Sequence, residues 1–221
     1  MGYHEHNYCF ILDIHTLKIK LAQHLLKELP GKSSQKIMLA KPRNPIKYSS
    51  NSECANPAAV LILLFPVIQD IRFFLTKRTS LVQYHKGEIS LPGGAWEKGE
   101  QLWGTALRET NEEIGVRAEH IQFIGKLTPL FAPVTGFLIH PFVGWMDDEP
   151  ETSPDPTEVE SLFSASVLSL TDQNFCRCEE RTSRGFVFDV PYFQLNKQKV
   201  WGATSMILSE FKTILKEVLD E

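Results

Sequence analysis

The sequence of residues 92–116 reads PGGAWEKGEQLWGTALRETNEEIGV. This stretch predicts a helix over residues 100–114, because apolar side chains recur at helical spacing and Gly115 is a typical helix stop. The apolar face of that helix consists of Leu102, Trp103, Ala106, Thr110 and Ile114.

Three glutamates crowd one edge of the predicted helix. At 100° per residue, Glu109 and Glu113 fall about 40° apart, and Glu112 lies about 60° beyond Glu109. Like charges at these spacings repel by roughly 0.2–0.5 kcal/mol per pair. Divalent cations remove this conflict, because Mg²⁺ and Mn²⁺ prefer hard oxygen ligands. A solvated helix face is the usual interpretation of a glutamate cluster by itself, and a metal site is the interpretation that the surrounding residues favour.

The residues around the cluster strengthen this interpretation. Gly93 and Gly94 place flexible backbone just ahead of the helix, where bare carbonyl and amide groups can approach a metal or a phosphate. Arg108 precedes the first of the three carboxylates and can orient them by bidentate pairing.

The stretch fits the pattern G-x5-E-x7-R-E-U-x-E-E-x-G-U, in which U is apolar, and this pattern resembles the Nudix box. The matching residues are Gly94, Glu100, Arg108, Glu109, Glu112, Glu113, Gly115 and Val116. Thr110 stands at the first apolar position and still offers a methyl group to the core. The resemblance extends over about residues 57–210 with weaker features.

The resemblance implies a Nudix hydrolase, which cleaves a nucleoside diphosphate linked to another group. The implied fold is α+β: an α/β/α sandwich with a mixed sheet, here with an added N-terminal helical extension. The implied cofactor is Mg²⁺ or Mn²⁺. Its implied ligands, which we call the box glutamates, are Glu109, Glu113, Glu112 and, as a supporting carboxylate, Glu100. Arg108 would hold them in place, and a carbonyl of Gly93 or Gly94 is a further candidate ligand.

The resemblance leaves the general base open between Glu109 and a glutamate of a distant loop. The stretch PDPTEVE at residues 154–160 is such a loop, and Glu158 matches an acidic "E-V" stretch of the coenzyme A subgroup. An acidic surface loop is an equally weighted alternative.

A second signature lies upstream of the box. Nudix enzymes that cleave coenzyme A carry L-L-T-x-R-[SA]-x3-R-x3-G-x3-F-P-G-G. The matching residues are Leu75, Thr76, Arg78, Gly87, Pro92, Gly93 and Gly94, and Gln83 replaces the second Arg. This resemblance implies a coenzyme A pyrophosphatase that releases 3′,5′-ADP and 4′-phosphopantetheine. Arg78 is the candidate phosphate-binding residue, and a structural ion pair is its alternative.

Two other functions compete with this one. A Nudix pyrophosphatase for ADP-ribose or a dinucleotide is favoured by Gln83, which places a neutral amide where a guanidinium would pair with phosphate. A non-catalytic binding module of the same fold would typically lose box glutamates, and all four are present.

Hydrophobic patterns predict the remaining organisation. Residues 1–55 form an N-terminal helical extension, with a helix at 14–29, that packs on a main domain at 56–221. The other expected elements are a hairpin of 58–68 and 71–76, strands at 120–131 and 136–146, and a helix at 202–219. Core packing is favoured over ligand contact for Trp201.

Composition bounds the partners and the location. The formal net charge of −4 argues against nucleic-acid binding, which usually shows a basic excess. The longest apolar stretch, residues 58–68, contains a proline and is too short for a bilayer. We expect a cytoplasmic protein with a small-molecule nucleotide substrate and no membrane partner, and a homodimer is left open. Cys176 and Cys178 are expected to be free thiols, and residues 4–9 are not expected to bind metal.

Overall fold

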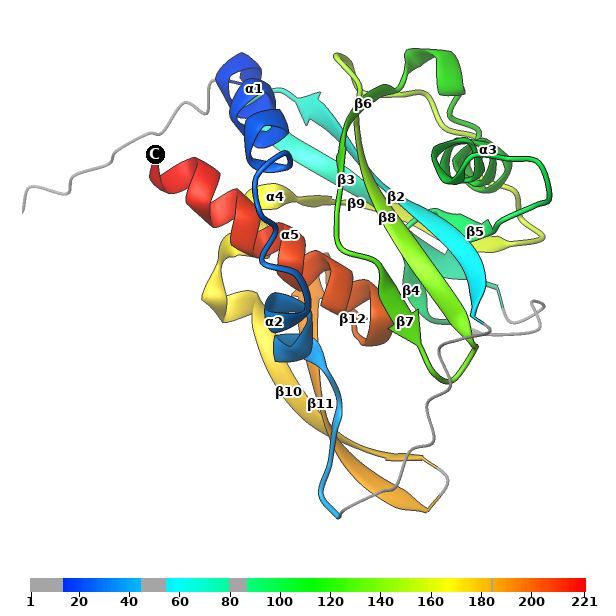
Figure 1. The fold of residues 1–221 in the computed structure, drawn as a ribbon, viewed down its shortest axis with the longest axis vertical. Helices are drawn as coiled ribbons and strands as arrows, with labels where there is room; N and C mark the ends of the chain where they lie inside the picture. Colours follow the sequence, from blue (N-terminus) through cyan, green and yellow to red (C-terminus); the bar gives the residue numbers. More distant parts are fainter. Residues whose placement is uncertain (1–13, 45–54, 80–86, 184) are drawn as a thin grey trace, which may run out of the picture.

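The computed structural model of the chain describes residues 14–44, 55–79, 87–183 and 185–221 (Figure 1). Its α-helices are α1 Ile14–His24, α2 Gly31–Gln35, α3 Leu102–Ile114, α4 Val167–Thr171 and α5 Gly202–Asp220. Short 3₁₀ turns cover Lys36–Met38, Ala118–His120 and Gln173–Phe175.

The strands that carry the site form one mixed sheet. They are β2 Asn56–Val67, β3 Asp70–Arg78, β4 Ile89–Ser90, β5 Gly93–Ala95, β6 Gln122–Lys126, β7 Leu130–Ala132, β8 Phe137–Trp145 and β9 Val159–Ser166. Their order is β4-β3-β2-β8-β6, with β5 paired to β2, β7 to β8 and β9 to β3. Strands β2 and β8 run parallel, whereas the predicted hairpin of β2 and β3 is antiparallel, which confirms it.

Side chains of β2 alternate between two apolar layers, as strand geometry requires. Leu61 and Leu63 face the layer under α3, together with Ala106 of that helix. Ile62 and Leu64 face the opposite layer, which contains Phe211 of α5 and apolar residues of α1. Figure 1 shows α3 on one side of the sheet and α5 on the other. The predicted α/β/α sandwich with a mixed sheet is therefore confirmed.

A second sheet lies outside the sequence-based prediction. It consists of β1 Lys41–Pro42, β10 Cys176–Ser183, β11 Phe186–Leu195 and β12 Gln198–Val200, in the order β1-β11-β10 with β12 paired to β11. The β10–β11 hairpin extends away from the mixed sheet at the bottom of Figure 1. Arg43 pairs with Asp189 at 2.7 Å and joins this hairpin to the N-terminal segment.

Two predicted elements differ in extent. The helix predicted over 14–29 ends at His24, because a turn follows it. The strand predicted over 120–131 divides into β6 and β7 around Pro129, which has no N–H to continue a ladder. The described part of the N-terminal extension packs against α5, and its Leu17 and Leu21 are buried in the core shared with the sheet.

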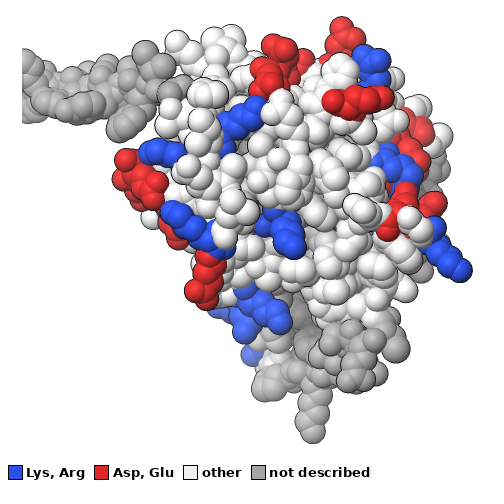
Figure 2. Space-filling view, turned by 45° about the horizontal axis from the view of Figure 1, so that its top comes forward, with Lys and Arg blue, Asp and Glu red and all other residues white. Residues whose placement is uncertain are grey.

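The distribution of charged side chains on the surface agrees with the small net charge of the sequence. On the face in Figure 2, acidic and basic side chains lie interspersed among larger uncharged areas. Cys176 and Cys178 are exposed free thiols, as expected. Among the described helices, none is both long and apolar enough to cross a membrane. Residues 4–9 lie outside the described residues.

Candidate active site

Two consecutive glycines bring the backbone of β5 against helix α3. A Cβ atom added to Gly94 would lie 2.3 Å from a carboxylate oxygen of Glu109, so glycine alone leaves room for that side chain. At Gly93 the added atom would lie 2.3 Å from the carbonyl oxygen of Ala59 on β2. The chain thereby places the Glu109 carboxylate directly against the strand that precedes the helix.

One guanidinium group binds three of the box glutamates. Arg108 donates from Nε to Glu100 at 2.7 Å. Its Nη1 atom donates to Glu109 at 2.9 Å and to Glu112 at 2.8 Å, and Nη2 donates to the carbonyl oxygen of Ala95 at 3.1 Å. The hydrogen bond from Arg108 is the largest cause of the low pKa of Glu100, about 2. Arg108 thus draws the carboxylates to one side of α3 and holds them to β5.

Glu113 is the most buried of the box glutamates, with 1% of its surface exposed. Arg78 donates from Nη1 to its Oε1 at 3.0 Å, and the backbone N–H of Gly93 donates to its Oε2 at 3.3 Å. Burial nevertheless raises the pKa of Glu113 to about 7, and the charges of Glu109 and Glu158 add to that rise. Burial also raises the pKa of Glu109. The carboxylates of Glu109 and Glu113 therefore lie where negative charge is unfavourable without a cation.

The loop before β9 folds back onto the end of α3. The backbone N–H of Ser153 donates to the carbonyl of Ile114 at 2.9 Å, and that of Asp155 donates to the carbonyl of Glu113 at 3.0 Å. The carbonyl of Glu158 accepts from Thr79 at 3.0 Å, so the loop also joins the end of β3. These bonds bring Glu158 to the same cleft as Arg78, although the two are far apart in sequence.

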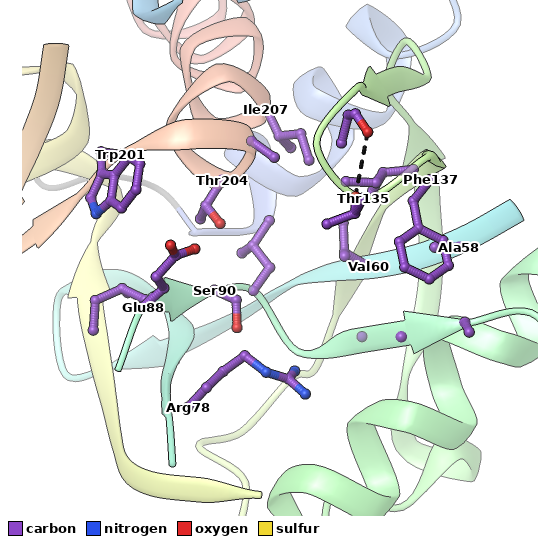
Figure 3. Close-up of a pocket in the computed structure, with 18 of the residues that line it drawn as sticks. Ala58, Val60, Arg78, Glu88, Ser90, Thr135, Phe137, Trp201, Thr204 and Ile207 are labelled. Atoms are coloured by element: carbon purple, nitrogen blue, oxygen red, sulfur yellow. Dashed lines mark hydrogen bonds between the residues drawn. The ribbon is translucent and has the colours of Figure 1, made fainter. Parts of the chain in front are cut away.

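A cleft of about 470 Å³ opens beside this group, on the face of the sheet that α5 covers (Figure 3). Arg78, Glu88, Ser90 and Glu158 give it polar groups, and β5 contributes the backbone of residues 93–95. Its apolar lining comes mainly from Ala58, Val60, Ala132, Phe137, Ile139, Ala203 and Ile207. In Figure 3, Arg78 and Trp201 lie on different sides of the cleft, with Ser90 and Glu88 between them. The cleft thus joins a polar end near the box glutamates to an extended apolar wall.

Trp201 departs from its expected role in core packing. Its side chain is only partly buried and lines the cleft, and the guanidinium carbon of Arg181 lies 4.1 Å from its ring centre. Its neighbour Val200 is fully buried, whereas the prediction of core packing is wrong for Trp201.

The structure brings together six of the residues that sequence analysis selected: Arg78, Gly93, Gly94, Glu109, Glu113 and Glu158. Glu112 lies further out, with 55% of its side chain exposed, and Glu100 lies on the far side of Arg108. Gln83 falls outside the described residues.

The donor chemistry of this group fits a hard divalent cation. The carboxylates of Glu109 and Glu113 repel each other and are also repelled by that of Glu158. A cation bound to their oxygens would relieve this repulsion. Within the described part of the chain, no three His, Cys, Asp or Glu side chains already form a compact metal-binding group. The reason is visible in the ion pairs, because Arg108 takes up Glu109 and Arg78 takes up Glu113. Metal ligation by these residues stays a prediction.

The family model for the NUDIX domain matches residues 55–177. The chain therefore belongs to the Nudix family and is a hydrolase of diphosphate linkages, which confirms the fold and enzyme class predicted from the box. Nudix hydrolases generally need divalent cations.

Individual relatives agree with this class. Nudix hydrolase 15, mitochondrial, of Arabidopsis thaliana is 32% identical over 200 residues, which cover 86% of this chain and 70% of that protein. Mitochondrial coenzyme A diphosphatase NUDT8 of Homo sapiens is 32% identical over 159 residues, covering 68% of this chain and 65% of that protein. The solved structure of RenU, a Nudix hydrolase from M. smegmatis, shares 15% identity at a TM-score of 0.48, over 82% of this chain and 93% of that chain.

Sequence reasoning missed the wall of the cleft that lies outside the matched family region. Thr204 and Ile207 of α5 line the cleft, whereas the sequence predicted only a helix there. Thr135 in the β7–β8 turn is a second omission. Their place in the cleft arises from packing between distant segments.

Proposed function

We propose that this hydrolase cleaves the diphosphate of coenzyme A or its derivatives and releases 3′,5′-ADP and 4′-phosphopantetheine. The shape of the cleft carries the proposal: it begins at Arg78 and the β5 glycines and continues along an apolar wall to Trp201. Such a cleft suits a diphosphate that bears a long, largely uncharged arm. The upstream motif around Arg78 and the similarity to the human coenzyme A diphosphatase support the same substrate.

In the proposed reaction, water attacks one phosphorus of the diphosphate and the bridging oxygen leaves with the other phosphate. Divalent cations on the box glutamates would neutralise the diphosphate and supply a bound water of lowered pKa. The guanidinium of Arg78 has five N–H donors, of which the bond to Glu113 uses one, so others are available for a phosphate oxygen.

The remaining side chains would hold the box glutamates in position and accept a proton from the attacking water. Arg108 would keep Glu109 and Glu112 in place through its two bonds from Nη1. Either Glu109 or Glu158 would accept the proton of the attacking water. Burial raises the pKa of Glu109, which makes its carboxylate a better proton acceptor near neutral pH, and Glu158 reaches the cleft from the opposite segment.

One observation favours a second candidate substrate. Gln83 stands where the coenzyme A motif has Arg, and it offers no positive charge to a phosphate. ADP-ribose or a dinucleotide, which lack the 3′-phosphate of coenzyme A, is therefore the alternative.

Four other expectations stay predictions: the absence of nucleic-acid and membrane partners, the cytoplasmic location, a homodimer, and the use of Mg²⁺ or Mn²⁺. Two relatives carry the word "mitochondrial" in their names.

A substrate panel tests the proposal. The full chain is incubated with coenzyme A, ADP-ribose, NADH, a diadenosine polyphosphate and a nucleoside triphosphate, with Mg²⁺ or Mn²⁺, and products are identified by mass. We expect the highest kcat/KM for coenzyme A, with 3′,5′-ADP and 4′-phosphopantetheine as products. A higher kcat/KM for ADP-ribose or a dinucleotide would favour the alternative and refute the coenzyme A assignment.

A further inference from the structure

A buried carboxylate on α5 accepts four hydrogen bonds from neutral groups. Glu210 has 0% of its surface exposed. Its Oε1 accepts from the Oγ1 hydroxyl of Thr128 at 2.7 Å, from the backbone N–H of Thr128 at 3.2 Å and from that of Gly31 at 3.2 Å. Its Oε2 accepts from Nε2 of Gln35 at 2.9 Å. A buried charge persists only when its oxygens are satisfied in this way, so the geometry around Glu210 is tightly specified.

These bonds join three segments that are distant in sequence. Glu210 belongs to α5, Thr128 to the connection between β6 and β7, and Gly31 and Gln35 to the N-terminal segment. Gln35 closes the group, because its Nε2 also donates to the carbonyl oxygen of Thr128 at 2.8 Å. The N-terminal segment and α5 both lie outside residues 55–177, the region that matches the family model.

Two of the joined segments form facing parts of the cleft. Ile207 lines it one helical turn before Glu210, and Ala132 lines it at the end of β7, which begins two residues after Thr128. The bond between Thr128 and Glu210 therefore links α5 to the β7 side of the cleft. The groups that face the diphosphate, on β5 and α3, have no bond to this network among the hydrogen bonds of the described residues.

We propose that Glu210 is a positioning residue for the substrate cleft: through Thr128 it sets the separation of α5 from β7, and hence the width of the apolar part of the cleft. In this arrangement Gly31 and Gln35 complete the bonding of Glu210. The inference rests on the proposed function only in taking this cleft as the substrate site.

The chain offers a matched pair of variants. Thr128→Val removes the hydroxyl that donates to Glu210 and keeps the size of the side chain. Thr213→Val makes the same chemical change on α5, where the hydroxyl bonds Ser34 at 3.0 Å and thus joins α5 to the N-terminal segment without reaching β7. We expect Thr128→Val to raise KM for coenzyme A at least fivefold with kcat within twofold of wild type. Thr213→Val should leave both constants near wild type.

Glu210→Gln is the second test of the link. It keeps the shape of the side chain but brings an NH₂ group among hydrogen-bond donors, and we expect KM to rise with kcat again little changed. Equal KM values in wild type, Thr128→Val and Glu210→Gln would overturn the inference. A rise of the same size in Thr213→Val would also overturn it, because a general loss of packing would then explain the effect.

Two further measurements separate this inference from the substrate assignment. KM is measured in parallel for ADP-ribose, so if only that compound is hydrolysed, the coenzyme A proposal fails and the variants are judged on ADP-ribose. Hydrogen exchange needs no substrate: Thr128→Val should accelerate exchange in both 130–137 and 203–207, and Thr213→Val should not. If the Thr128→Val protein exchanges hydrogen in these two segments at the wild-type rate, the positioning role of Glu210 is contradicted. This holds even if no tested substrate is hydrolysed.

Discussion

Glu109 and Glu113 lie one helical turn apart on α3 and pair with different arginines. Arg108 holds Glu109 from the same helix, and Arg78 reaches Glu113 from the end of β3. Both carboxylates have raised pKa values, mainly because of burial. Such shifted pKa values are typical of carboxylates that bind a cation or transfer a proton, rather than of carboxylates that only stabilise the fold.

Glu109→Gln tests the role of the carboxylate against β5. The amide keeps the size of the side chain but loses its charge, so we expect kcat/KM to fall at least about a hundredfold, or ~2.7 kcal/mol. Unfolding by denaturant should show little loss of stability, because Arg108 retains Glu100 and Glu112. The matched control is Glu119→Gln, an exposed position beyond the box, which should keep full activity. Near-wild-type turnover in Glu109→Gln would remove this residue from the site.

Glu113 predicts a pH dependence of stability in metal-free protein. Its pKa rises from 4.5 to about 7 in the folded chain, so the folded state binds the proton more tightly than the unfolded state. This contribution to stability is complete below about pH 4.5 and is lost as the pH rises through 7, by up to about 3 kcal/mol. In EDTA, the unfolding free energy of wild type should therefore fall between pH 5 and 8 relative to Glu113→Gln. A difference between the two proteins that does not vary with pH would contradict the assignment.

Among helices and strands, the spacing of apolar residues predicts an element best where that element has one buried face. Helix α3 is predicted at 100–114 and found at Leu102–Ile114, because its apolar stripe and the left-handed Gly115 are local signals. The β2–β3 hairpin follows from two apolar runs and a short turn. The second sheet has weaker signals: β10 carries mostly exposed, charged side chains, so its pairing depends on β11 rather than on its own pattern.

The same contrast holds within the site. The box glutamates and Arg108 are readable because they share one helix and its preceding loop, where spacing translates directly into geometry. Their separate partners are not readable in this way. That Arg78 meets Glu113, or that the Glu158 loop bonds to the end of α3, depends on how β3, β9 and α3 pack together.

The whole molecule explains why the cleft was only partly predictable. Its polar end comes from the family motifs, but its apolar wall includes Trp201 and Ile207 from the C-terminal part of the chain. The N-terminal segment, whose role the sequence leaves open, shares a core with α5 and bonds to Glu210. We therefore expect substrate selection to depend on segments on both sides of the family region as well as on the box.

We propose that the glutamate edge of α3 binds hard cations beside the diphosphate. The most direct measurement is the anomalous difference density of crystals soaked in manganese. We predict peaks bounded by Glu109 and Glu113 on the β5 side of the helix, with the Arg108–Glu109 bond lengthened or broken. No peak there, with the ion pairs of Arg108 and Arg78 unchanged at saturating manganese, would contradict the account.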